Sequence, residues 1–311
     1  MKLAILEYEN FDKKILDDLN SYFKVELFDI KKINLNQILQ EYDVVWLRLG
    51  YKFHDELFNG NLKCKIIVCP ATGIDHLNPK ICKKNDIKII SLKNESSFLK
   101  EVRSTAELTL LLTLSLLRKI RPILSDISQG KFNRDNFRGN DLDGKIVGVI
   151  GLGRLGKIVS DLYSSFGCKI IGFDIKKKID FKYTKASTIE ELVEKADIIT
   201  IHVDLNEESI NLIDKRLFLK MNPNVILINT SRSPIINSKD LIFSLKNNII
   251  AGAALDVVDD ELNFGTDNLF YDAYTKYENL IITPHIGGNT FESFKKTERF
   301  IYNKLIKELN G

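Results

Sequence analysis

Short apolar runs alternate with amphipathic segments along the first ninety residues of the chain. The runs have the length of strands, whereas the segments between them repeat apolar positions at the helical spacing of three and four residues. This alternation predicts βα units that form a mostly parallel sheet with helices on both faces. The predicted strands are Lys2–Glu7, Val25–Asp29, Val44–Arg48, Lys65–Cys69 and Ile87–Leu92, and the predicted helices are Phe11–Tyr22, Leu35–Tyr42 and Asp55–Phe58.

A long stretch with helical spacing, Phe98–Ile127, follows this first series. Its central residues, Leu108–Leu117, are apolar on nearly all sides, which predicts a buried helix at a domain or subunit interface. Because the apolar run is far shorter than the roughly 20 residues that span a bilayer, it predicts no membrane segment.

A second alternating series begins after Gly144 and predicts a second parallel sheet. We expect Ser238 to cap the helix that starts at Lys239, because a serine oxygen there accepts from the N–H groups of the first turn. At roughly 100–200 residues per domain, two series in 311 residues predict two domains. The predicted strands are Lys145–Ile150, Lys169–Phe173, Ile198–Val203, Val225–Asn229, Ile249–Leu255 and Leu280–Thr283, and the predicted helices are Leu155–Phe166, Ile189–Lys195, Lys239–Lys246 and Phe291–Leu309.

A glycine-rich loop joins the first strand and the first helix of the second series. Gly151, Gly153 and Gly156 form the pattern G-x-G-x-x-G, with Arg154 and Leu155 between the last two glycines. Such a loop allows a tight turn, close approach of a diphosphate to the backbone, and close packing of the helix against the strand. The helix N-terminus adds unpaired N–H groups that favour an anion. The context predicts a dinucleotide site, although the same letters also occur in glycine-rich turns of unrelated α/β folds.

Asp174 follows the next predicted strand, eighteen residues after Gly156. A carboxylate at this position accepts hydrogen bonds from the hydroxyl groups of the adenosine ribose and repels a 2′-phosphate. The sequence therefore predicts NAD rather than NADP as the cofactor.

Three residues suited to carbonyl reduction, Arg232, Glu261 and His285, each follow a predicted strand of the second series. The carboxyl ends of parallel strands meet at one edge of a sheet, where we expect the nicotinamide end of a dinucleotide. A protonated histidine can donate a proton to a developing alkoxide, a carboxylate can stabilise that imidazolium, and a guanidinium can bind a substrate carboxylate. Each residue alone also fits an ordinary interpretation, as a loop histidine, an exposed acid or a surface cation, so only the three together indicate function.

Charge and cysteine content narrow the class of protein. The 45 basic and 42 acidic side chains give a formal net charge of +3, a balance that is untypical of a nucleic-acid-binding protein. The four cysteines form no CxxC pair and no zinc pattern, so we predict no metal site and reduced thiols in a cytoplasmic protein.

Five short segments, taken in order, resemble the signatures of the D-isomer-specific 2-hydroxyacid dehydrogenase family, which includes D-3-phosphoglycerate, glycerate and D-lactate dehydrogenases. The segments are Ser104–Glu107, Gly151–Gly156, Asn229–Arg232, Leu255–Glu261 and Thr283–Gly288. The resemblance implies an α/β fold of two doubly wound parallel-sheet domains, a Rossmann NAD-binding domain inserted into a flavodoxin-like substrate-binding domain. The implied NAD-binding domain is residues 99–285, and the discontinuous substrate-binding (catalytic) domain is residues 1–98 and 286–311.

The resemblance also implies roles for individual residues. Arg232 resembles the arginine that orients the substrate, Glu261 the partner of the histidine, and His285 the general acid and base. The residues that resemble cofactor-binding positions are Gly151, Gly153, Arg154, Leu155, Gly156, Asp174, His202, Thr230, Ser231 and Asp256. Those that resemble substrate-binding positions are Arg48, Thr72, Gly73 and again Arg232.

Some positions depart from the family pattern. Ser233 replaces the glycine that usually follows the arginine, Leu262 replaces a common proline, and Ala71 replaces the first glycine of the substrate loop. None of these changes removes a charge that the chemistry needs, so the resemblance predicts the reaction but not the substrate.

We therefore predict an NAD-dependent dehydrogenase that interconverts a small D-2-hydroxy acid and its 2-keto acid by hydride transfer. The resemblance and the apolar segment Leu108–Leu117 further predict a homodimer, with no nucleic-acid or membrane partner. Two alternatives stay open: a regulatory or corepressor-like protein that binds NAD(H), and a formate- or phosphite-type dehydrogenase on the same scaffold.

Overall fold

The computed structural model describes residues 1–176 and 178–310, and the chain divides into two compact units. Unit 1 contains Met1–Val102 and Thr290–Gly311, and unit 2 contains Arg103–Asn289. Unit 1 is therefore discontinuous, because both ends of the sequence contribute to it. Each boundary lies four residues after the expected one, at 102 rather than 98 and at 289 rather than 285.

Unit 1 is built on a five-stranded sheet in the order β2-β1-β3-β4-β5. All of its strand pairs are parallel, and the order is the flavodoxin-like one, in which the winding reverses between β1 and β3. The strands are β1 (Lys2–Ile5), β2 (Lys24–Leu27), β3 (Val44–Trp46), β4 (Ile66–Cys69) and β5 (Lys88–Ser91).

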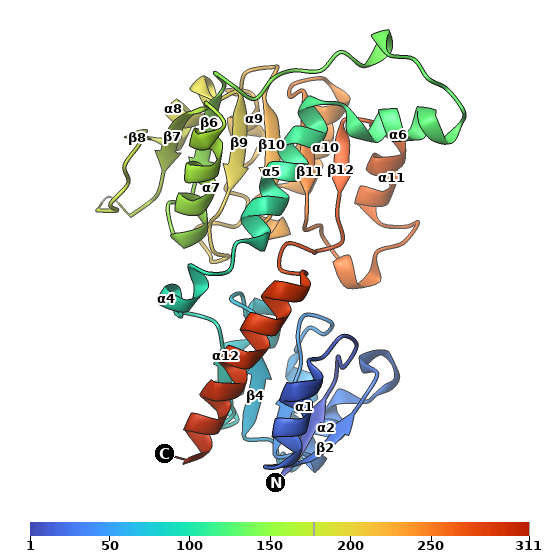
Figure 1. The fold of residues 1–311 in the computed structure, drawn as a ribbon, viewed down its shortest axis with the longest axis vertical. Helices are drawn as coiled ribbons and strands as arrows, with labels where there is room; N and C mark the ends of the chain where they lie inside the picture. The colour runs from blue at the N-terminus through green and yellow to red at the C-terminus, as the bar shows by residue number, and fades with distance from the viewer. Residues whose placement is uncertain (177, 311) are drawn as a thin grey trace. The chain divides into compact units, whose positions relative to one another are not determined.

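Helices cover both faces of this sheet, namely α1 (Lys13–Asn20), α2 (Leu35–Glu41), α3 (Pro79–Lys84) and α12 (Phe291–Asn310). Alternate residues of β1 point to opposite faces, so Leu3 and Ile5 pack with α1 and α12, whereas Ala4 packs with α2 and α3. Helix α12 runs beside β4 and contacts this sheet although it comes from the far end of the sequence (Figure 1).

Unit 2 contains a seven-stranded sheet in the order β12-β11-β10-β9-β6-β7-β8, again with only parallel pairs. This is the Rossmann order with β12 added at one edge. The winding reverses between β6 and β9, and such sheets bind ligands at the carboxyl ends of the strands at this point. The strands are β6 (Ile146–Ile150), β7 (Lys169–Phe173), β8 (Thr184–Lys185), β9 (Ile198–Ile201), β10 (Ile226–Asn229), β11 (Gly252–Leu255) and β12 (Leu280–Ile282).

The main helices of unit 2 form a layer on each face of this sheet (Figure 1). On one face, α5 (Ser104–Leu117) and α7 (Arg154–Ser165) contact each other and share a core with the strands. The helices of the opposite face are α8 (Ile189–Lys195), α9 (Lys215–Phe218), α10 (Ser238–Lys246) and α11 (Leu269–Lys276). Short 3-10 helices are η1 (Ile30–Lys32), η2 (Asp55–Phe58), η3 (Asp75–Leu77), η4 (Asp135–Phe137), η5 (Ser233–Ile235) and η6 (Glu261–Asn263).

The long helix expected over Phe98–Ile127 is wrong, because the structure forms α4 (Ser96–Leu99), α5 and α6 (Ile120–Ser128) there. Lys119, between α5 and α6, has a left-handed backbone with a φ of 54°. Pro122 gives the physical reason, since proline lacks an N–H group and its ring would clash with the carbonyl four residues earlier in a continuous helix. Nowhere in the described residues is a helix both long and apolar enough to cross a membrane.

The cap expected at Ser238 is also wrong. Asn237 caps α10, because its side-chain oxygen accepts from the N–H of Asp240, and Ser238 is the first helical residue. The elements α3, α9, α11 and β8 were not predicted, since each has eight residues or fewer and shows no clear period.

Candidate active site

The glycine loop lies between β6 and α7, where the winding of the unit 2 sheet reverses. Gly151 has a φ of +93°, and a Cβ added to it would lie 2.4 Å from the carbonyl oxygen of His202. A Cβ on Gly156 would lie 1.9 Å from the carbonyl oxygen of Gly151. Gly153 is exposed, and apart from its neighbours along the chain no atom of the described residues lies within 4 Å of the same position on it. The loop is therefore tightly packed at two glycines and open at the third, which suits the approach of a diphosphate.

His202 follows β9 and lies beside this loop. Its Nε2 lies 2.8 Å from the hydroxyl oxygen of Thr200, and its Nδ1 is buried with no hydrogen-bond partner among the described residues. Burial, with help from the charge of Arg154, lowers the pKa of His202 to about 3, so its imidazole is neutral at ordinary pH. A buried nitrogen that has no partner in the protein is suited to a ligand group.

The start of α7 and the end of β7 supply the remaining groups of the predicted dinucleotide site. Arg154 and Leu155 are the half-buried first residues of α7, and burial lowers the pKa of the Arg154 guanidinium. Asp174 follows β7, and its carboxylate accepts from the N–H of Leu152 at 2.8 Å and from the N–H of Lys176 at 2.9 Å. These bonds fix the Asp174 carboxylate beside the glycine loop, so the residues present fit a dinucleotide.

The turn after β10 carries Arg232 and is held by the side chain of Asn229. The Asn229 amide donates to the carbonyl oxygen of Arg232 at 3.0 Å, and its oxygen accepts from the N–H of Ser231 at 2.9 Å. The Ser231 hydroxyl donates to the carbonyl oxygen of Ile201 in β9 at 2.6 Å, and the Arg232 guanidinium donates to the carbonyl oxygen of Ser231 at 2.8 Å. Sequence reasoning gave Asn229 no role, although asparagine at the start of a turn is a recognisable signal for such bonds.

His285 and Glu261 form a hydrogen-bonded pair at the carboxyl ends of β12 and β11. Nδ1 of His285 lies 2.8 Å from Oε1 of Glu261, and both side chains are partly exposed to solvent. An ionised carboxylate can only accept, so Nδ1 carries the proton in this pair and Nε2 is the nitrogen that can exchange a proton with a substrate. The structure therefore brings together two of the three predicted catalytic residues.

Asp256 was expected at the cofactor, but in the structure it is buried and holds the loop that carries His285. Its carboxylate accepts from the hydroxyl of Thr283 at 2.6 Å and from the N–H groups of Ile286 and Gly287, each at 2.8 Å. Burial raises the pKa of this carboxyl group, and the three hydrogen bonds oppose that rise. His285 has a left-handed backbone with a φ of 55°, a conformation that surrounding contacts must maintain. Asp256 therefore positions His285, and its contact with the cofactor stays a prediction.

Asp259 and two serines connect the Arg232 turn with the Glu261 loop. The hydroxyl of Ser233 donates to Oδ1 of Asp259 at 2.6 Å, and the hydroxyl of Ser238 donates to Oδ2 at 2.5 Å. Both serines are buried, Ser233 directly follows Arg232, and Asp259 lies two residues before Glu261. The serine that replaces the usual glycine therefore supplies one of the two contacts that join these segments.

The predicted substrate-binding residues of unit 1 follow β3 and β4. The Arg48 guanidinium pairs with the buried carboxylate of Glu298 in α12 and lies 4.3 Å from the centre of the Phe294 ring. Burial raises the pKa of Glu298, and the charge of Arg48 opposes that rise. Arg48 therefore attaches α12 to the rest of unit 1, and its substrate-side role stays a prediction. Thr72 and Gly73 lie in the loop between β4 and η3, where Thr72 is exposed.

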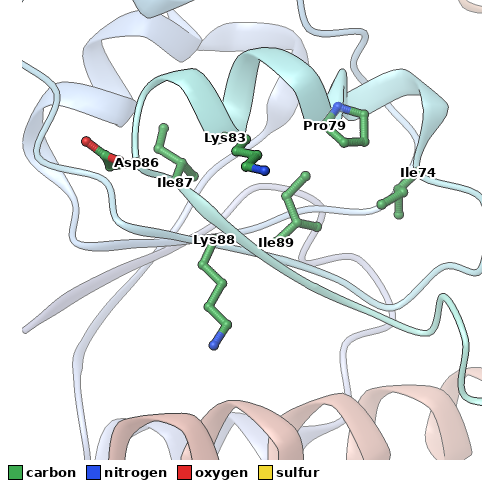
Figure 2. Close-up of a pocket in the computed structure, with 7 residues that line it drawn as sticks. All are labelled: Ile74, Pro79, Lys83, Asp86, Ile87, Lys88 and Ile89. Carbon is green, nitrogen blue, oxygen red and sulfur yellow. The ribbon is translucent and has the colours of Figure 1, made fainter.

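An open cavity of about 410 Å³ lies between α3 and β5 of unit 1, with Lys83 and Lys88 among the residues around it (Figure 2). Its lining includes Ile74, which follows Gly73, but no residue that was predicted to bind cofactor or substrate. The cavity therefore adds nothing to the site in unit 2.

A glycine loop that suits a dinucleotide and a hydrogen-bonded histidine–glutamate pair, at the same edge of one Rossmann sheet, are typical of an oxidoreductase that depends on a dinucleotide. Comparison with known sequences then gives the family. The family model described as "D-isomer specific 2-hydroxyacid dehydrogenase, NAD binding domain" matches residues 110–287, which is more than half of the chain. The chain belongs to this family of oxidoreductases, which use a nicotinamide dinucleotide as cofactor.

Individual proteins show how far the similarity extends. The chain is 32% identical over 286 residues to D-3-phosphoglycerate dehydrogenase of Methanocaldococcus jannaschii, which covers 91% of this chain and 52% of that protein. It is 30% identical over 282 residues to glyoxylate reductase of Thermofilum pendens, with coverage of 88% and 80%. The chain thus spans about half the length of the phosphoglycerate dehydrogenase. The structure of D-lactate dehydrogenase from Aquifex aeolicus with NAD and lactic acid has the same fold, with a TM-score of 0.84, 24% identity, and coverage of 100% and 96%.

Proposed function

We propose that this protein interconverts a small D-2-hydroxy acid and its 2-keto acid with NAD, and that His285, Glu261 and Arg232 are its catalytic residues. The observation that carries this proposal is the His285–Glu261 hydrogen bond at the same sheet edge as the glycine loop. The names of its relatives, a D-3-phosphoglycerate dehydrogenase and a glyoxylate reductase, support acids of this kind as substrates.

The proposed roles follow from the chemistry of each side chain. When bound, the nicotinamide supplies or accepts the hydride at C2 of the substrate. In reduction, Nε2 of protonated His285 donates a proton to the oxygen on C2, while Glu261 holds Nδ1 and stabilises the imidazolium. Arg232 binds the substrate carboxylate and polarises the adjacent carbonyl. In oxidation His285 must start neutral to accept the proton, so lower pH favours reduction and higher pH favours oxidation.

The binding residues are proposed on the same basis. The glycine loop and Arg154 would hold the diphosphate, and Asp174 would accept from the ribose hydroxyl groups, which favours NAD over NADP because a carboxylate repels a 2′-phosphate. The backbone amides of Thr72 and Gly73 would bind the substrate carboxylate, a role that the family resemblance supports.

NADH oxidation with a panel of 2-keto acids tests this function. The panel contains glyoxylate, hydroxypyruvate, pyruvate and 3-phosphohydroxypyruvate, and formate and phosphite are assayed with NAD in the opposite direction. We expect turnover of at least one keto acid, and a fall in kcat of roughly 10²- to 10⁴-fold in His285→Ala with NADH binding retained. Full activity of His285→Ala would contradict the role of His285. NADH binding without turnover of any keto acid would contradict the proposed function. Oxidation of formate or phosphite would then favour the formate- or phosphite-type alternative, and its absence would favour the regulatory one.

We also propose that the protein forms a homodimer through α5 and α6. Large apolar side chains on these helices and on the segment that follows them are exposed, and the exposed fraction reaches 62% for Leu124 and 92% for Phe132. The others are Leu111, Ile120 and Ile127. Burial of this surface against a second copy would be favourable, since each Å² of apolar surface removed from water contributes about 25 cal/mol of stabilising free energy.

A further inference from the structure

Two pairs of hydroxyl groups, both anchored on α5, lie in the interior of unit 2 between α7 and the end of β10. The phenol oxygen of Tyr163 in α7 lies 2.6 Å from the hydroxyl oxygen of Thr113 in α5. One turn earlier in α5, the hydroxyl oxygen of Thr109 lies 3.0 Å from that of Thr230, which follows β10. All four side chains are buried. The reaction chemistry described above uses none of Tyr163, Thr113 and Thr109.

Counting protons fixes the direction of each of these hydrogen bonds. The Thr109 hydroxyl lies 2.7 Å from the carbonyl oxygen of Thr105, which can only accept, so Thr109 donates its single proton there. Toward Thr230 the Thr109 oxygen can therefore only accept, and Thr230 must be the donor. In the same way, Thr113 donates to the carbonyl oxygen of Thr109 at 3.0 Å, so Tyr163 donates to Thr113.

The consequence is that the proton of Thr230 points into the protein. Its oxygen then has only lone pairs for any further partner, so it can bind a donor but cannot donate. The neighbouring Ser231 hydroxyl is likewise committed, because it donates to the backbone of β9. Thr230 lies at the carboxyl end of β10, where the nicotinamide half of a dinucleotide binds in sheets of this order.

We propose that Thr109 is a positioning residue that makes the Thr230 hydroxyl a fixed acceptor for a donor group on the nicotinamide half of the cofactor. This inference rests on the proposed function in one respect, the cofactor-facing position of Thr230. The donor is either the carboxamide N–H₂ group or a hydroxyl of the nicotinamide ribose. Without Thr109, the Thr230 hydroxyl is free to rotate and to turn its proton toward that donor.

Fluorescence titration with NADH tests this proposal in the full-length protein. We expect Thr109→Val to raise the NADH Kd roughly fivefold, about the net effect of one hydrogen bond, and Thr109→Ser to bind like the unmodified protein because it restores the oxygen. Thr113→Val is the matched control, since it removes the same kind of back-bond from the same helix but leaves Thr109 Oγ1 in place. Thr113→Val should lower the melting temperature but leave the NADH Kd within about twofold of the value for the unmodified protein. The hydrogen bonds that it removes do not involve Thr230.

A double-mutant cycle shows whether Thr109 acts through Thr230. Thr230→Val should weaken NADH binding, and adding Thr109→Val to it should weaken binding no further, because the two residues form one interaction. Unchanged binding in Thr109→Val, or additive losses in the double variant, would overturn the proposal. If Thr109→Val does not fold, Thr109→Ala removes the same oxygen from a smaller side chain and is read in the same way.

Reduced 3-acetylpyridine adenine dinucleotide identifies the donor, because it carries a methyl group in place of the carboxamide nitrogen. Equal binding of this analogue by the unmodified protein and Thr109→Val assigns the donor to the carboxamide, whereas a retained difference assigns it to the ribose. Both outcomes support the proposal. NADH binding by the unmodified protein without reduction of any keto acid would contradict the proposed function and leave this inference standing, so the two failures are distinguishable.

Discussion

The imidazole of His202 shows how burial determines the protonation state of a side chain. Thr200 contacts one of its nitrogens, the other is buried without a partner among the described residues, and a guanidinium lies in its electrostatic surroundings. Burial, and to a smaller extent the positive charge of Arg154, disfavour a positive charge on the imidazole, so the folded protein holds His202 in its neutral form. The unfolded chain has no such environment, and its histidine binds a proton near the ordinary pKa of about 6.5.

This difference predicts a pH-dependent stability. The folded pKa of about 3 lies below the unfolded value, so the unfolded state binds more protons between these two values and stability falls as the pH drops below about 6.5. From pH 7 to pH 5 the loss from this one group is about 2 kcal/mol, at 1.36 kcal/mol per pH unit. Urea unfolding at both pH values should therefore show a smaller loss in His202→Gln than in the unmodified protein. Equal losses in the two proteins would disprove the assignment.

At the scale of elements, the short segments that follow β10 and β11 determine the geometry of the site. The carboxylate of Asp259 accepts a hydrogen bond from the hydroxyl of Ser233, at the start of η5. It accepts another from the hydroxyl of Ser238, at the start of α10. These two bonds join the segment after β10, which carries Arg232, to the segment after β11, which carries Glu261.

We predict that Asp259→Asn lowers kcat by roughly tenfold, since misplacement of a catalytic group by about 1 Å can cost up to about 10²-fold. The amide keeps one acceptor oxygen and replaces the other with a donor, so one serine loses its acceptor. Asp260→Asn is the control, because it removes the same negative charge from the next residue. Among the side-chain hydrogen bonds described, the Asp260 carboxylate accepts only from Asn263. Steady-state kinetics, NADH titration and thermal melting compare the two variants. Equal kcat values would show that Asp259 has no positioning role.

The same elements show what sequence could and could not predict. The glycine loop and the residues after the strands were recognisable because their chemistry depends on neighbours in the sequence. The break between α5 and α6 was also encoded locally, in Pro122, but apolar periodicity concealed it. The hydrogen bonds of Asp256 and Thr109 could not be predicted from the sequence. Asp256 binds a backbone N–H about 30 residues away and Thr109 a hydroxyl 121 residues away, and only the tertiary fold brings these groups together.

At the scale of the whole molecule, the exposed apolar side chains of α5 and α6 predict that the protein forms a dimer. Light scattering at micromolar concentration should give about twice the chain mass of 35.6 kDa. Leu124→Glu should shift the protein toward monomer, because it places a charge in the apolar surface of α6 that a dimer would bury. Leu219→Glu is the control, since Leu219 has the same exposed fraction of 62% but follows α9 on the opposite face of the unit 2 sheet. A monomeric unmodified protein, or equal behaviour of both variants, would contradict the proposed interface.

The return of α12 to unit 1 has a consequence for the order in which a nascent chain can fold. Unit 2 is one continuous segment and can fold once residue 289 has left the ribosome. The sheet of unit 1 is synthesised first, and α1 can cover part of one face, yet the part that packs against Ile301 and Leu305 stays uncovered until α12 is made. At about 5–20 residues per second, the 187 residues of 103–289 delay that cover by about 10–40 s. During this interval the unit 1 sheet exposes the apolar surface that α12 later covers, which makes it a site for chaperone binding.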